Sequence, residues 1–150
     1  MADSTIPYAI DGLLTLFKTK NGMAKLQIID GQPTVDLESD YLAIGYSSSL
    51  GIPAVSGSQA PYAIGNLRRI ETYDIACEAS SFNGSFVMKK ARDRAFQIFG
   101  YVEEVVRADG TLNASIMFGD IGNIQVEQTQ TSKGAVCNVN FTISVKITRL

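Results

Sequence analysis

The sequence of 150 residues contains no histidine and no tryptophan, and only two cysteines. Without histidine, Ser-His and Cys-His catalysis and every histidine-containing metal site are excluded. The 13 lysines and arginines do not exceed the 15 acidic residues, so the chain lacks the basic excess with which nucleic-acid-binding proteins neutralise phosphates. No apolar run approaches the roughly 20 residues that span a bilayer. These absences argue against a sequence-specific nucleic-acid binder and against a membrane protein.

The first residues, MADSTIPYAIDGLL, lack the basic region and the small-residue cleavage site of a secretory signal. We therefore expect synthesis and folding in a cytoplasm. Cys77 and Cys137 each lie on the apolar face of a predicted strand, where a free thiol behaves as a small hydrophobic side chain. They are neighbours if their strands pair, but a reducing compartment does not favour a disulfide.

Candidates for catalysis or metal binding are few. Glu103 and Glu104 are adjacent in a predicted helix, so their side chains point about 100° apart and do not form a carboxylate dyad. An acidic cluster lacks the spacing of a calcium loop; its members are Asp30, Asp36, Glu38 and Asp40. Neither glycine-rich phosphate-binding motif occurs. We expect no catalytic residue, no metal ligand set and no cofactor, and hence a protein that is not an enzyme.

Two segments have the apolar spacing of amphipathic helices. The first begins near Ile6, with Ser4 or Thr5 as its cap, and ends before the Asn21-Gly22 pair. Its stripe is Ile6, Ile10, Leu13, Leu14 and Phe17. The second is capped by Ser85 and runs to about Arg107. Its stripe is Val87, Ala91, Ala95, Ile98, Val102 and Val105, widened by Met88, Phe99 and Val106.

Six segments have the alternation or the short apolar runs of strands, and the last has the strongest pattern. They are residues 24–29, 41–46, 68–79, 115–119, 123–131 and 135–150. In the third, Thr72, Asp74 and Glu78 are expected on the solvated face. The order of elements predicts an α+β fold, a single domain over residues 1–150 in which two helices pack on one face of a mainly antiparallel sheet. The opposite face is polar and meets either water or a neighbouring subunit.

Residues 47–66 are rich in Ser, Gly, Pro and Ala and have no period, which predicts a long loop that is functional or becomes ordered on binding. Its possible anchors at an assembly interface are Leu50, Ile52, Val55, Tyr62 and Ile64. The charged residues Arg68, Arg69 and Glu71 follow directly. They either form pairs between subunits or solvate the end of the strand.

Several short segments, in this order, resemble the tail terminator proteins of long-tailed bacteriophages of the siphovirus type, particularly those of phages that infect actinobacteria. The resemblance covers nearly the whole chain. It rests on IDGLL at 10–14, IGY at 44–46, RRIETYDIACE at 68–78, RDRAF at 92–96, EQT at 127–129, GAV at 134–136 and VNFTI at 139–143. The small-residue loop at 47–66 departs from what we expect of this family.

The resemblance implies a virion protein at the neck, the head-proximal end of the tail, that is assembled in the host cytoplasm. It implies a homo-oligomer, a hexameric ring, that caps the tail tube protein, stops its elongation and offers a surface to the head-tail connector or stopper. It implies no sequence-specific nucleic acid, with DNA only passing through the ring. Two alternatives stay open at this point: another neck or tail-tube structural component, and a small ligand-binding or hydrolytic domain that uses serine or carboxylates.

Overall fold

The computed structural model describes residues 4–20, 26–33, 40–49, 51–61, 69–108 and 118–149. Two helices and six strands lie in this part of the chain. In order they are α1 (Ile6–Thr19), β1 (Gln27–Asp30), β2 (Asp40–Ile44), β3 (Val55–Pro61), β4 (Arg69–Asn83), α2 (Met88–Ala108), β5 (Phe118–Gln130) and β6 (Ala135–Arg149). Neither described helix is long and apolar enough to cross a membrane.

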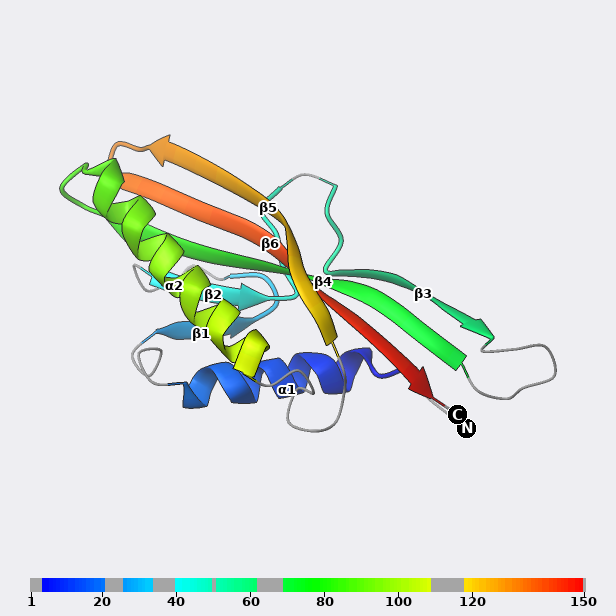
Figure 1. Cartoon of the computed structure of the whole chain (residues 1–150). Coiled ribbons are helices and arrows are strands. Elements are labelled where there is room, and N and C mark those ends of the chain that lie inside the picture. Colours follow the sequence, from blue (N-terminus) through cyan, green and yellow to red (C-terminus); the bar gives the residue numbers. More distant parts are fainter. Residues whose placement is uncertain are drawn as a thin grey trace.

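All six strands belong to one sheet, and both helices lie on the same face of it (Figure 1). Strands β4 and β6 form its centre and pair along their full length, from Arg69 opposite Arg149 to Asn83 opposite Ala135. Strand β5 adds to the other side of β6. Strands β2 and β3 share the remaining edge of β4, end to end. Only the β1–β2 pair is parallel, so the predicted α+β fold with a mainly antiparallel sheet is confirmed.

Helix α1 forms where the sequence predicted it, with Pro7 in its first turn, where a missing N–H costs no hydrogen bond. Its buried residues are Ala9, Leu13, Leu14 and Phe17, while Ile6 and Ile10 are only partly buried. Ser4 Oγ accepts a hydrogen bond from the Ile6 N–H at 3.2 Å, so Ser4 acts as a local cap. The Thr5 side chain makes no cap bond of its own.

Helix α2 places its predicted stripe in the core, with Ala91, Ala95, Ile98 and Val102 fully buried. The predicted cap at Ser85 is wrong. Asn83 Oδ1 accepts the N–H of Ser85 at 3.0 Å and that of Val87 at 3.4 Å, and the helix begins at Met88. An asparagine placed before the first turn satisfies free N–H groups in this way.

The final hairpin confirms the strongest pattern in the sequence. From Cys137 to Val145, every second residue of β6 is buried on the helix side, and Ile147, which follows in the same alternation, is partly buried. The two strands predicted at 115–119 and 123–131 are one strand, β5, within the described residues. Its ladder is interrupted between Gly122 and Gln125, where Asn123 has a φ of 53°. This β-bulge breaks the alternation that a sequence pattern detects.

The two thiols lie on paired strands but are not neighbours. Cys77 is opposite Phe141, and Cys137 is opposite Ser81. Four register positions correspond to about 13 Å, which is too far for a disulfide. Both residues are free and buried, as a packing role requires.

Candidate assembly surfaces

Four of the eight predicted interface residues lie outside the described part: Leu50, Tyr62, Ile64 and Arg68. Arg69 is the first residue of β4. Ile52 is 43% exposed. Val55 begins β3 and packs partly buried against the core. Glu71 is only 2% exposed, so the structure separates these residues into different environments.

Glu71 is a buried carboxylate that ties three segments of one chain together. Its Oε1 accepts the Thr5 N–H at 2.8 Å and the Thr5 hydroxyl at 2.5 Å. Its Oε2 accepts Ser4 Oγ at 2.7 Å and Gln59 Nε2 at 2.6 Å. Glu71 therefore lies at the start of α1 and holds β3 to β4, so the predicted alternative in which it solvates the end of the strand is wrong. Burial acts to raise its pKa, but the hydrogen bonds from Thr5, Ser4 and Gln59 outweigh burial and lower it to about 2.

The predicted loop at 47–66 is also wrong for its central part, because residues 55–61 form strand β3. Strand β4 is 15 residues long, whereas β2 covers only its second half, from Cys77 to Ser81. The first half leaves an unpaired edge, and β3 pairs with it from Val55 opposite Ile75 to Pro61 opposite Arg69. The composition of β3, mostly small and polar residues, gave no strand signal.

Residues 45–49 and 51–54, here called the crossing segment, connect β2 to β3 across the polar face of the sheet. Ser48 Oγ donates a short hydrogen bond to Glu78 Oε1, and Ser47 Oγ donates to Asn140 Oδ1 at 3.0 Å. Ser49 Oγ reaches β5, 3.2 Å from Glu127 Oε1. Part of the polar face is thus covered by the chain itself.

Glu78 is fully buried beneath the crossing segment, which corrects its prediction as a solvated residue. Its Oε2 accepts the Tyr41 hydroxyl at 2.7 Å. Burial, together with the hydrogen bond to Glu78 and its nearby charge, raises the pKa of Tyr41 above its ordinary range. The other two residues predicted on the solvated face, Thr72 and Asp74, are exposed and half-buried respectively.

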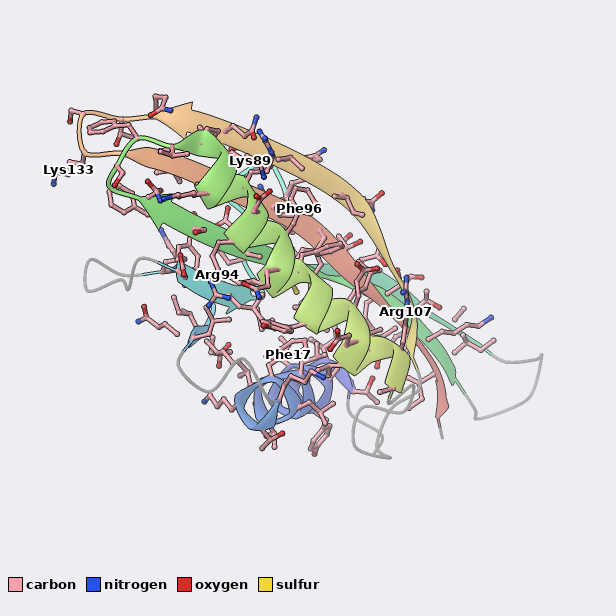
Figure 2. All side chains as sticks on the ribbon, turned by 60° about the vertical axis from the view of Figure 1, so that its left-hand side comes forward. Phe17, Lys89, Arg94, Phe96, Arg107 and Lys133 are labelled. Carbon is pink, nitrogen blue, oxygen red and sulfur yellow. The ribbon has the colours of Figure 1, made fainter. Side chains whose placement is uncertain are left out.

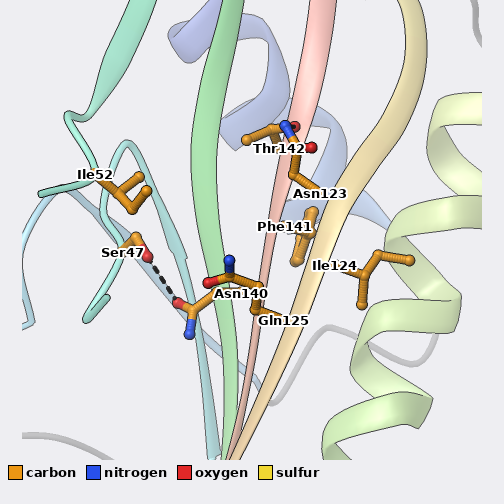
Figure 3. Close-up of a pocket in the computed structure, with 8 residues that line it drawn as sticks. All are labelled: Ser47, Ile52, Asn123, Ile124, Gln125, Asn140, Phe141 and Thr142. Carbon is orange, nitrogen blue, oxygen red and sulfur yellow. Dashed lines mark hydrogen bonds between the residues drawn. The ribbon is translucent and has the colours of Figure 1, made fainter. Parts of the chain in front are cut away.

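A pocket of about 240 Å³ opens between the crossing segment and the β-bulge of β5 (Figure 3). Its lining comes from Ser47, Ile52, Asn123, Ile124, Gln125, Asn140, Phe141 and Thr142. Among the described residues, Asn140 Nδ2 has no hydrogen-bond partner. The volume is below the roughly 300 Å³ at which ordinary small-molecule sites begin.

The carboxylates considered for catalysis have structural partners instead. Glu103 pairs with Arg107 at 2.9 Å, and Glu104 pairs with Lys20 at 2.9 Å. Asp40 binds Arg94 at 3.0 Å, while Asp36 and Glu38 of the acidic cluster lie outside the described ranges. Within those ranges no three Cys, Asp or Glu side chains gather as a metal site would need.

Within the part of the chain that the structure describes, the clearest unpartnered surface is the outer edge of β5. Residues 123–130 are all exposed, and Ile124 and Val126 are exposed by 51% and 43%. Phe96 of α2, exposed by 38%, lies on the side of the helix that faces β5 (Figure 2). One turn earlier Arg92 donates to Gln128 of β5 at 2.9 Å, which fixes that orientation. The sequence did not predict this exposed edge, because the pattern of a strand assigns its apolar residues to the core.

No protein-family model and no curated protein matches the chain. A solved structure described as "Virion of native gene transfer agent (GTA) particle" contains a chain with the same fold. The TM-score is 0.58, the sequence identity is 10%, and the match covers 93% of this chain and 93% of that chain. At this identity the similarity shows a shared fold over nearly the full length of both chains.

Proposed function

We propose that this chain is a structural protein of a phage-like virion and that it forms the ring that caps the tail tube. The observation that carries the proposal is the shared fold with a chain of a gene transfer agent particle, over 93% of both chains. The resemblance of short segments to tail terminator proteins, noted from the sequence, supports the finer assignment.

The surfaces of the described residues are consistent with assembly rather than catalysis. The buried carboxylates Glu71 and Glu78 are occupied by hydrogen bonds within the chain. The outer edge of β5, by contrast, exposes both apolar side chains and backbone groups that no described residue pairs with. A ring subunit needs such surfaces and needs no catalytic group, and closure of a ring removes the free edges that would otherwise aggregate.

In this proposal six copies form the ring at the head-proximal end of the tail, in a virion assembled in the host cytoplasm. One side of the ring contacts the tail tube protein and stops its elongation, and the other contacts the head-tail connector or stopper. DNA passes through the opening without sequence recognition. Of the predicted interface residues whose side chains the structure describes, Ile52 is exposed, and it lines the pocket.

The test is to mix the purified protein with its tail tube protein and to image the tubes by negative-stain electron microscopy. We expect a ring at one end of each tube, tubes that stop growing, and a six-copy mass by native mass spectrometry at high protein concentration. A strict monomer that also fails to join tubes would overturn the proposal. Tubes that bind the protein but continue to elongate would instead identify another neck or tube component.

A further inference from the structure

In the described ranges, the sheet has two edge strands on opposite sides, β5 and β3, whose outer edges are free. Among the described residues, β5 pairs only with β6, and β3 pairs only with β4. Free edges usually carry lysine, proline or charges that prevent pairing with another chain. Strand β5 contains neither lysine nor proline, and its charged residues are Asp120 and Glu127. Strand β3 has no charged residue, and its proline is the last residue, Pro61.

The two edges present complementary features on the same face of the sheet. On the β5 edge, Val126 lies opposite the core residue Val139, so its exposed side chain points to the helix face. On the β3 edge, Gly57 lies opposite Tyr73, which also points to that face. Gly57 has no side chain, and a groove of about 310 Å³ lies beside it. The groove is lined by Ser4, Ile6, Val55, Gly57, Ser58, Gln59, Glu71 and Tyr73.

The backbone groups of Gly57 and Val126 are also directed correctly for pairing. The Ala76 N–H donates to Ala54 O at 2.9 Å, so the backbone groups of Ala76 face β3. Because this direction alternates along each antiparallel strand, the groups of Gly57 face away from β4. The same alternation, followed through Val139, makes the groups of Val126 face away from β6.

We infer that the outer edge of β5 in one copy pairs with the outer edge of β3 in the next copy, with Val126 opposite Gly57 and its side chain in the groove. The inference rests on the proposed ring and names its subunit contact. Strand β5 runs parallel to β4, and β3 runs antiparallel to it. Copies in the same orientation therefore form an antiparallel pair, and the contact is head-to-tail, as a ring requires.

The position of β1 determines the register. Strand β1 pairs with β2, which pairs with β4, so β1 lies alongside the part of β4 from Cys77 to Ser80. Val126 is level with Ala79 in its own copy, so an unstaggered neighbour would run into β1. If the neighbouring copy is shifted by six residues along the strands, its Val126 lies beside Tyr73 of the first copy. Its Gln130 then lies beside Cys77, the position at which β1 ends. Six is the smallest even stagger at which the strand β5 itself, up to Gln130, overlaps β1 only at this last residue, and an even stagger keeps each side chain on its face.

The stagger agrees with the geometry of a closed ring of strands. Six residues correspond to about 20 Å along a strand, and four strand spacings, from β3 to β5 and on to the next β3, correspond to about 19 Å across the sheet. Together they require a strand tilt of about 45° to the ring axis, at the upper end of the roughly 35–45° of closed barrels.

Engineered cysteines test this register directly. In the inferred pair, Ser56 of one copy lies opposite Glu127 of the next, and both side chains are exposed on the polar face. The test variant carries Ser56→Cys and Glu127→Cys, and the control carries Ser56→Cys and Thr129→Cys. Thr129 is two residues further along the same face, which puts the two Cα atoms about 8 Å apart, too far for a disulfide. Within one copy, three strand spacings of about 14 Å prevent an internal bridge.

We expect the oxidised test variant to give a ladder of covalent oligomers on a non-reducing gel, up to the size of the ring, and the control to remain largely monomeric. Equal cross-linking of both variants, or rings in the microscope without cross-linking of the test variant, would overturn the edge pairing and leave the proposed ring standing. Cross-linking by a protein that does not cap tubes would support the pairing and count against the proposed function.

A second pair of variants tests the contact without cysteines. Val126→Lys places a charge in the inferred groove, and Tyr8→Lys places the same charge at a site exposed by 64% on α1. We expect Val126→Lys to abolish the ring mass while the melting temperature stays within a few degrees of the parent, and Tyr8→Lys to leave the ring intact. Rings of normal mass from Val126→Lys would refute the inference.

Discussion

Glu71 offers the sharpest test of how the structure holds its β3 edge. We consider Glu71→Gln, which keeps the size of the side chain but replaces one accepting oxygen by a donating NH₂ group. The Ser4 hydroxyl at 2.7 Å and the Gln59 amide at 2.6 Å then face a donor or must turn away. The substitution therefore weakens the hydrogen bonds that connect the amino-terminal segment and β3 to β4.

The magnitude follows from the pKa of this carboxyl group. Its decrease from the ordinary 4.5 to about 2 corresponds to about 3 kcal/mol of preference for the charged form in the folded state. Because Glu71 lines an open groove, we discount this preference for solvent screening and expect Glu71→Gln to lower the free energy of unfolding by about 2 kcal/mol at pH 7.

The direction of the pKa shift also determines how the contribution of Glu71 to stability changes with pH. Because the folded pKa of Glu71 is lowered, its stabilisation is fully present above about pH 5 and is lost as the pH falls toward 2. Urea unfolding of the parent and of Glu71→Gln should therefore give curves of stability against pH that differ at pH 7 and converge between pH 5 and pH 2. As a control, Glu103→Gln changes a surface pair in which Arg107 is exposed and Glu103 half-buried, and it should cost at most about 0.5 kcal/mol. Parallel curves for the parent and Glu71→Gln across this range would refute the reasoning.

Three further outcomes follow from the core and the polar face. Phe141→Ala should lower the free energy of unfolding in urea by about 3–5 kcal/mol, because this ring is 2% exposed. Phe96 is 38% exposed, so Phe96→Ala should cost less than about 1.5 kcal/mol. Equal effects of the two substitutions would contradict the assigned faces. Glu78→Ala should cost about 1–3 kcal/mol and speed amide exchange in the crossing segment but not in β6, whereas unchanged exchange would show that Glu78 does not hold it. Cys77 and Cys137 should resist a thiol reagent until the protein unfolds, because burial raises both pKa values, that of Cys77 to about 12; rapid labelling of the native protein would disprove their burial.

The sequence alone determined the elements that have one apolar face. The stripe of α2 and the alternation of β6 are each repeated over many residues, so the pattern itself states which side is buried. The α+β class followed from the order of these elements. Burial of Leu13, Phe17 and Phe141 was predictable because each lies in step with its own neighbours.

Only the tertiary structure determined which polar residues are buried and that β3 forms a strand. Glu71 depends on Ser4 and Thr5, more than 65 positions earlier in the chain, and Glu78 depends on Tyr41 and the crossing segment. A carboxylate is buried only where hydrogen-bonding partners surround it. These partners come from distant parts of the chain, so a local sequence pattern does not predict the burial. Strand β3 exists because the long β4 leaves an edge to be filled, so backbone pairing overrode a composition typical of a loop.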